Sequence, residues 1–84
     1  MANGTFPFLS PMGDATFYLS PSPDSPTFVE VGDEVQEDTI ICIIEWKKIR
    51  NEIKAETRGI ILEVLAQNGK PISFGQPLFT IWPY

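Results

Sequence analysis

A short pattern of residues occurs twice in the chain, and this internal repeat limits the folds that the sequence can adopt. A turn glycine is followed at fixed distances by three apolar positions, first at Gly32, Val35, Ile41 and Ile44 and again at Gly69, Ile72, Leu78 and Ile81. Each residue of the second copy lies 37 positions after its counterpart (69 − 32 = 37). Two copies are too few for a solenoid. The pattern therefore predicts a domain built from two similar halves that face each other.

The rest of the chain consists of short strand-like runs separated by residues typical of turns. These runs are rich in apolar, aromatic and β-branched side chains, and they span Phe6–Leu9, Thr16–Leu19, Phe28–Val31, Ile40–Ile44, Ile60–Leu65 and Leu78–Trp82. None shows helical periodicity, so we predict an all-β sandwich or barrel with no helix between Ile40 and Leu65. Gly32 and Gly69 are expected in equivalent turns. Alternation indicates a core formed by Phe17, Phe28, Ile41, Ile43, Ile60, Leu62, Val64, Leu78 and Ile81,.

One segment is predicted to form a hairpin whose tip carries lysines. The apolar run Ile40–Ile44 is followed, after few residues, by a second extended run that starts at Ile53,. Lys47 and Lys48 lie at the tip between them, and the tip residues 46–49 include no Gly, Asn or Asp. A tight two-residue turn requires positive φ, which Gly or Asn adopts at the least cost. A turn that is locally unfavourable indicates a functional constraint at this position.

The composition excludes several classes of activity. The 84 residues include no histidine and one cysteine, so a nucleophile paired with a histidine base and a thiolate–imidazole metal site cannot form. We therefore predict a non-catalytic domain, with no catalytic or metal-ligating residues. Cys42 is interpreted as a small buried side chain in a reducing compartment. No apolar run is long enough to cross a bilayer and Met1–Gly4 lacks the features of a secretory signal, so no membrane partner is expected,.

The charged residues are distributed unevenly along the chain. The net charge is −5, yet five of the six basic residues gather at Lys47, Lys48, Arg50, Lys54 and Arg58. A basic tip on an acidic body offers no broad basic face, which disfavours nucleic-acid binding. The cluster fits local recognition of an anionic partner or an ordinary solvated surface.

The hairpin residues resemble the attachment motif of biotin carboxyl carrier proteins, which reads Glu-Ala-Met-Lys-Met-Met-Asn-Glu-Ile. Five positions match in register, at Glu45, Lys48, Asn51, Glu52 and Ile53, and four differ, at Trp46, Lys47, Ile49 and Arg50. The resemblance implies that Lys48 is the covalent biotin acceptor. It also implies that Lys48 is flanked in the site by Glu45, Trp46, Lys47, Ile49, Asn51 and Glu52. A lysine on an exposed tip suits this role because its tether raises the effective concentration of the carried group.

Two further segments extend the resemblance over nearly the whole chain. Ser10–Tyr18 resembles the family pattern Ser-Pro-Met-Val-Gly-Thr-Phe-Tyr, with the three residues Gly13, Asp14 and Ala15 where the family has two. The extra residue predicts a bulge or a wider turn. Ser20–Thr27, which contains three prolines, resembles the thumb of carrier proteins from acetyl-CoA carboxylases of the bacterial and plastid type. We call Ser20–Thr27 the thumb and expect it to project without joining either sheet.

The resemblance implies a specific fold, function and set of partners. The expected fold is a flattened barrel-sandwich of two four-stranded antiparallel sheets with quasi-twofold symmetry, the hairpin at one end and both termini at the other. Residues 1–84 would form one domain, with residues 1–5 disordered. The domain would carry carboxybiotin between biotin carboxylase and carboxyltransferase of acetyl-CoA carboxylase, in fatty acid synthesis, after modification by a biotin–protein ligase. The expected location is the cytoplasm, or the plastid in a eukaryote.

Three alternatives stay open. The altered residues at the turn are compatible with a non-biotinylated homologue that acts as a binding or regulatory subunit. Attachment of lipoate is disfavoured, because lipoyl domains usually carry Asp-Lys-Ala at the turn and the thumb is uncommon among them. A nucleic-acid-binding role is disfavoured because the clustered charges would neutralise few phosphates.

Overall fold

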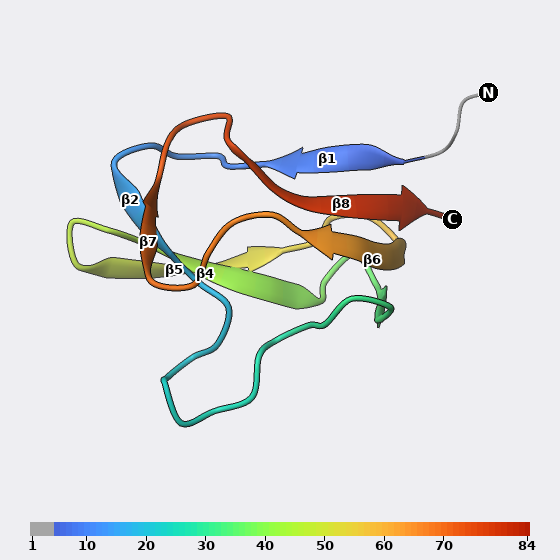
Figure 1. The fold of residues 1–84 in the computed structure, drawn as a ribbon, viewed down its shortest axis with the longest axis horizontal. Helices are drawn as coiled ribbons and strands as arrows, with labels where there is room; N and C mark the ends of the chain where they lie inside the picture. Colours follow the sequence, from blue (N-terminus) through green and yellow to red (C-terminus); the bar gives the residue numbers. More distant parts are fainter. Residues whose placement is uncertain (1–4) are drawn as a thin grey trace.

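The computed structural model describes residues 5–84, and every regular element among them is a β-strand (Figure 1). The strands are β1 (Phe6–Leu9), β2 (Ala15–Tyr18), β3 (Glu34–Val35), β4 (Ile40–Trp46), β5 (Ile49–Lys54), β6 (Gly59–Val64), β7 (Lys70–Ile72) and β8 (Pro77–Pro83). They form two four-stranded antiparallel sheets in the orders β1-β8-β6-β3 and β5-β4-β2-β7. The predicted all-β sandwich is confirmed.

Two expectations concern features outside the sheets. The described residues include no helix that is long and apolar enough to cross a membrane. The predicted disorder at residues 1–5 falls, except for Thr5, on residues outside the described part of the chain.

An approximate twofold symmetry relates the two sheets and follows the internal repeat. β1, β8, β6 and β3 hold the same places in one sheet as β5, β4, β2 and β7 hold in the other. Gly32 and Gly69 adopt positive φ angles of 95° and 79° in turns outside the strands. In each turn the residue after the glycine donates a backbone hydrogen bond across the turn, from Asp33 to Glu30 at 3.0 Å and from Lys70 to Gln67 at 3.2 Å. The prediction of equivalent glycine turns is therefore confirmed.

The first half of the molecule is longer than the second because it contains the thumb. The amide of Gly32 donates to the Ile61 carbonyl, and the amide of Gly69 donates to the Phe17 carbonyl. Phe17 precedes Gly32 by 15 residues, whereas its counterpart Ile61 precedes Gly69 by 8 (32 − 17 = 15; 69 − 61 = 8). None of residues 20–27 joins a strand, and the loop projects from the body between β2 and β3, as predicted (Figure 1).

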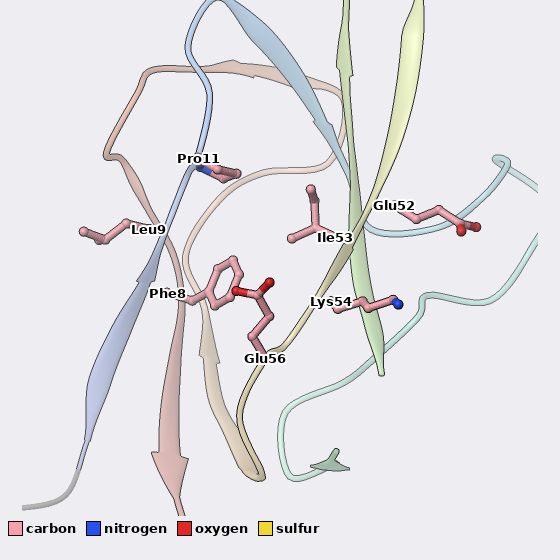
Figure 2. Close-up of a pocket in the computed structure, with 7 residues that line it drawn as sticks. All are labelled: Phe8, Leu9, Pro11, Glu52, Ile53, Lys54 and Glu56. Carbon is pink, nitrogen blue, oxygen red and sulfur yellow. The ribbon is translucent and has the colours of Figure 1, made fainter. Parts of the chain in front are cut away.

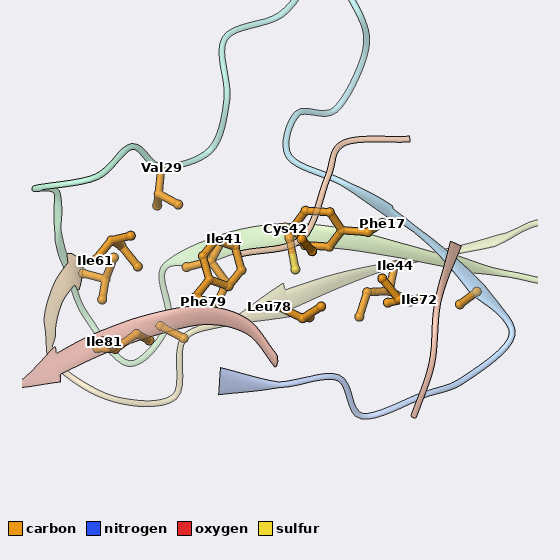
Figure 3. Close-up of a cluster of buried hydrophobic side chains, with 14 residues drawn as sticks. Phe17, Val29, Ile41, Cys42, Ile44, Ile61, Ile72, Leu78, Phe79 and Ile81 are labelled. Atoms are coloured by element: carbon orange, nitrogen blue, oxygen red, sulfur yellow. The ribbon is translucent and has the colours of Figure 1, made fainter. Parts of the chain in front are cut away.

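The core lies between the two sheets (Figure 3). Its fully buried side chains come from both sheets and include Phe17, Ile41, Ile44, Ile61, Leu78, Phe79 and Ile81. The rings of Phe17 and Phe79 join the sheets with their centroids 5.9 Å apart. The predicted core is thus correct at Phe17, Ile41, Leu78 and Ile81. Ile43 is also buried, but it lies outside this main cluster.

The core residues predicted in strand β6 were wrong by one position at Ile60 and Leu62. Ile61 is fully buried, whereas Ile60 is half-buried and Leu62 is exposed. The pairing of β6 with β8 shifts register between Ile61 and Glu63, which marks a bulge and breaks the simple alternation,. Val64, after the bulge, packs against the core only partly.

Two other sequence interpretations are refined by the structure. Phe28 is half-buried, while its neighbour Val29 enters the core with 4% exposure. The additional residue of the Gly13–Ala15 segment is accommodated by a wider turn before β2, where Asp14 has a φ of 51°. The pairs that β2 makes with β4 show no register shift.

Candidate functional site

The two lysines form the tip of the β4–β5 hairpin. The two strands pair from Ile40 and Lys54 to Trp46 and Ile49, which leaves a two-residue turn. Lys47 and Lys48 have φ angles of 50° and 66°. Positive φ at both central residues is the signature of a type I′ turn, whose twist matches that of the strands it joins. The prediction of a locally unfavourable lysine turn is confirmed, since a left-handed conformation costs about 1–2 kcal/mol for a residue with a Cβ.

The tip stands at one end of the molecule, away from the chain ends. Figure 1 places the β4–β5 turn opposite the C-terminus. Phe6, at the start of β1, pairs with Ile81, near the end of β8, so both ends of the described chain lie together. The side chains of Lys47 and Lys48 are exposed. An incoming partner can therefore approach the lysines while the sandwich stays folded.

Asn51 links the two strands just below the turn. Its Nδ2 donates to the Ile44 carbonyl on β4 at 3.2 Å and to the Ile49 carbonyl on β5 at 3.4 Å. The same atom lies 3.9 Å from the Met12 sulfur, in the connection between β1 and β2. Asn51 is half-buried and directly opposite Ile44 in the ladder. Its amide therefore fixes the hairpin internally and against the body of the domain.

The two predicted glutamates have different surroundings. Glu45 is half-buried on β4, between Thr16 of β2 and Arg50 of β5 in the strand register. Glu52 is exposed on β5, opposite Ile43. Neither carboxylate shares the turn with Lys48. The structure therefore brings the lysines, Trp46 and Ile49 together at the tip, with Asn51 beneath them, and places both glutamates along the stem.

Arg50 connects the hairpin with the thumb, a role that the sequence comparison missed. Its Nη2 donates a 2.7 Å hydrogen bond to the Pro21 carbonyl, and its guanidinium carbon lies 5.6 Å from the centre of the Tyr18 ring. A cavity of about 290 Å³ lies where these parts meet, lined by Tyr18, Ser20, Pro21, Ser22, Pro23, Arg50 and Asn68. The sequence itself carries no direct signal of this contact, because Arg50 and Pro21 lie 29 positions apart.

Trp46 and Lys47 contact each other at the tip. Trp46 is the last residue of β4 and is 37% exposed. The Nζ atom of Lys47 lies 4.6 Å from the centre of the Trp46 ring. This distance is within the range of a cation–π interaction. Among the described residues 5–84, the cation–π contacts are this one and the pair formed by Arg50 and Tyr18.

A second depression lies in the seam between the sheets (Figure 2). This groove of about 360 Å³ runs between β1 and β5 and is lined by Phe8, Leu9, Pro11, Glu52, Ile53, Lys54 and Glu56. Phe8 and Ile53 point into the seam from opposite sides. Of the predicted site residues only Glu52 lines this groove, so it is separate from the lysine turn.

Cys42 cannot serve as a nucleophile in the folded domain. Its side chain is fully buried on β4 within the core cluster. Burial raises the pKa of the Cys42 thiol from 9.0 to about 12, because the thiolate loses its hydration,. The thiol is therefore protonated at neutral pH, and the interpretation of Cys42 as a buried apolar side chain is confirmed. Within residues 5–84, no group of three or more acidic, cysteine or histidine residues could hold a metal ion.

A quasi-symmetric β-sandwich that presents lysines on a type I′ turn has the architecture of an attachment domain. Residues 10–81 match the family model for biotin and lipoyl attachment, described as biotin-requiring enzyme. The match covers most of the chain, and the chain belongs to this family.

Several carrier proteins resemble the chain closely. It is 56% identical over 77 residues to the biotin carboxyl carrier protein of acetyl-CoA carboxylase 2, chloroplastic, of Arabidopsis thaliana, covering 92% of this chain and 30% of that protein. It is 55% identical over 74 residues to the biotin carboxyl carrier protein of acetyl-CoA carboxylase of Chlamydia pneumoniae, covering 88% of this chain and 44% of that protein. It is 49% identical over 80 residues to the biotin carboxyl carrier protein of acetyl-CoA carboxylase of Chlamydia trachomatis, covering 95% of this chain and 48% of that protein. The chain thus spans between about a third and a half of the length of these relatives.

Proposed function

We propose that this chain is the biotin carboxyl carrier domain of an acetyl-CoA carboxylase and that biotin is attached covalently to Lys48. The observation that carries the proposal is the position of Lys48, which is exposed at a strained type I′ turn and in register with the acceptor of the carrier motif. The similarity to carrier proteins of acetyl-CoA carboxylase at 49–56% identity supports the assignment. Residues 1–84 would form a single carrier domain that works without catalytic groups of its own.

The residues of the tip fit a covalently tethered group. The Lys48 side chain is exposed, so its amine can enter a ligase pocket without unfolding the hairpin. In the attachment step the neutral Nζ attacks the carbon of an activated acyl group, an amide bond forms, the leaving group departs with its electron pair and the released proton passes to solvent. Bound biotin would supply the carboxyl-carrying chemistry, and the protein would supply its position.

The other residues of the hairpin support this step by holding the tip in place. Asn51 keeps the strands of the hairpin in register through its bonds to the Ile44 and Ile49 carbonyls. A fixed tip reduces the conformational freedom that is lost when a partner binds. The long lysine side chain would then act as the mobile arm, which raises the effective concentration of the carried group at each site within reach.

The proposed function implies partners of three kinds. A biotin–protein ligase would modify Lys48, a biotin carboxylase would load the carried group, and a carboxyltransferase would unload it, as a step of fatty acid synthesis. The basic tip, with Lys47, Lys48 and Arg50, would meet these partners first. We propose a location in the cytoplasm, or in the plastid if the source is eukaryotic.

The test is the mass of the intact chain after incubation with a biotin–protein ligase, ATP and biotin. One biotinyl group should be added, and Lys48→Arg should abolish the addition because a guanidinium is not a nucleophile. Lys47→Arg should leave the addition intact. Loss of labelling in Lys47→Arg alone would show that the acceptor is Lys47.

A second candidate is supported by the turn sequence itself. Trp46, Lys47 and Ile49 replace the alanine and two of the three methionines of the carrier motif. These replacements favour a homologue that kept the fold and lost the modification, as a binding or regulatory subunit. A variant that combines Trp46→Ala, Lys47→Met and Ile49→Met restores the motif at these positions and distinguishes the two candidates. If only the restored variant is labelled, the second candidate is correct.

A further inference from the structure

The turn presents two adjacent primary amines, and the structure gives them different surroundings. Both lysines are exposed and both have positive φ, so neither exposure nor backbone geometry separates them. Their contacts do: Nζ of Lys47 lies 4.6 Å from the centre of the Trp46 ring, and within residues 5–84 Lys48 makes no such ring contact. The amines at the tip are therefore chemically unequal.

We propose that Trp46 is a specificity-determining residue, which holds the Lys47 amine on its ring and thereby directs acylation to Lys48. The inference rests on the proposed function, in which Lys48 is the acceptor. It concerns the choice between two lysines, a choice that the carrier motif does not pose because methionine precedes its acceptor. In this chain Lys47 replaces that methionine, and the residue before it is the tryptophan that the lysine contacts.

The physical basis is that the ring attracts the charged amine more strongly than the neutral amine. The face of an indole ring carries partial negative charge and binds an ammonium group above it. Acyl transfer requires a neutral amine whose lone pair is free to approach the acyl carbon. The Lys47 amine must therefore give up its contact with Trp46 before it reacts. At an exposed site this contact is weak, and it should disfavour reaction at Lys47 by about two- to five-fold.

The position of Trp46 in the hairpin keeps its ring near the turn. Trp46 pairs with Ile49 as the last cross-strand pair before the turn, so its backbone is fixed by the ladder. With 37% exposure the ring is partly covered, which limits the rotamers that it can adopt. The Lys47 amine thus meets an aromatic face that the fold has already positioned.

The experiment measures the intrinsic reactivity of the two amines without a ligase. The folded chain is treated with a limiting amount of the N-hydroxysuccinimide ester of acetic acid. The neutral amine attacks the ester carbonyl, an amide bond forms, the ester C–O bond breaks, N-hydroxysuccinimide leaves with the electron pair, and buffer takes up the proton. Tandem mass spectrometry of the peptide that contains both lysines then gives the ratio of acetylation at Lys47 to acetylation at Lys48.

The expected result is a low ratio in the unsubstituted chain and an about two- to five-fold higher ratio in Trp46→Leu, which keeps bulk and removes the aromatic face. Trp46→Phe, which retains a weaker aromatic face, should give an intermediate ratio. The matched control is Trp82→Leu, because Trp82 is also partly exposed, on β8, and should leave the ratio unchanged. An unchanged ratio in Trp46→Leu, or an equal rise in Trp82→Leu, would overturn the proposal.

A second measurement guards against misfolding and separates this proposal from the proposed function. The ε-methylene proton resonances of Lys47 should be shifted upfield relative to those of Lys48 by the Trp46 ring current, and Trp46→Leu should remove the shift. Absence of the shift in the unsubstituted chain overturns the proposal without any variant. Ligase labelling of neither lysine would contradict the proposed function alone, because the acetylation ratio does not depend on a ligase.

Discussion

The guanidinium of Arg50 donates a 2.7 Å hydrogen bond to the carbonyl of Pro21 and thereby joins the lysine hairpin to the thumb. The two residues are 29 positions apart in the chain, and strands β3 and β4 lie between them in sequence. The ring of Tyr18, over which the same guanidinium lies at 5.6 Å, extends this link to the body of the domain. The thumb is therefore tethered to the hairpin and does not project freely.

Substitution of Arg50 by methionine, the residue of the carrier motif, should loosen the thumb. The loss of one exposed hydrogen bond should lower the free energy of unfolding by no more than about 1 kcal/mol. Amide hydrogen exchange should nevertheless accelerate at Ser25, whose amide bonds to Ser22 within the thumb,. The control is Lys54→Met on the same strand, and equal acceleration in both variants would contradict a specific role for Arg50.

Substitution of Lys47 by asparagine should stabilise the domain, because asparagine tolerates positive φ better than lysine does. With a φ of 50° at this position, we expect a gain of about 0.5–1 kcal/mol in the free energy of unfolding, measured by urea denaturation,. Labelling at Lys48 should persist. Lys54→Asn, within strand β5, should give no gain. A loss of stability in Lys47→Asn would show that the turn is not strained at this residue.

Substitution of Asn51 by aspartate should loosen the tip, because a carboxylate cannot donate to the Ile44 and Ile49 carbonyls that the amide now contacts,. We expect a loss of about 1–2 kcal/mol in the free energy of unfolding and faster amide exchange at Ile49. Asn68→Asp is the matched control, since Asn68 accepts a bond from the Leu19 amide through Oδ1 and aspartate can also accept it. Equal losses in both variants would exclude a specific role for the donating amide.

The parts of the fold that depend on periodicity and repeats could be predicted from the sequence. The hairpin and the paired glycine turns follow from local residue preferences, and the cost of the hairpin turn follows from lysines in the place of Gly or Asn. The positive φ angles of Gly32 and Gly69, and of Lys47 and Lys48, confirm these predictions,. The bulge in β6 could not be predicted in this way. Apolar side chains occur on both faces of the strand within residues 60–64, so their alternation does not show which face is buried. The pairing with β8 decides that Ile61 points inward,.

The contacts of the candidate site were less accessible to sequence reasoning than the position of its lysines. The link from Arg50 to Pro21 depends on where the thumb folds back, and residue types alone do not fix the path of a loop,. The contact between Lys47 and Trp46 depends on side-chain directions at a turn whose type is set by the strands,. The contacts of Trp46, Lys47 and Arg50, which all differ from the family motif, could therefore be found only from the structure.

The buried thiol of Cys42 should make the stability of the domain sensitive to alkaline pH. Burial raises the pKa of Cys42 to about 12 from 9.0, so the folded protein retains a proton that the unfolded chain releases above pH 9,. The stabilisation is complete below the unfolded pKa and is lost as the pH rises from about 9 towards 12,.

Over this window one such group lowers the free energy of unfolding by up to about 1.4 kcal/mol per pH unit. The measurement compares the unsubstituted chain with Cys42→Ala by urea denaturation between about pH 8 and about pH 11, so that the two proteins differ only by this thiol. The variant should be less stable near neutral pH, because the smaller alanine side chain leaves a cavity in the core. Above about pH 9 its free energy of unfolding should fall less steeply with pH, by a slope that corresponds to about one proton. Parallel declines in the two proteins would show that the folded and unfolded thiols have the same pKa.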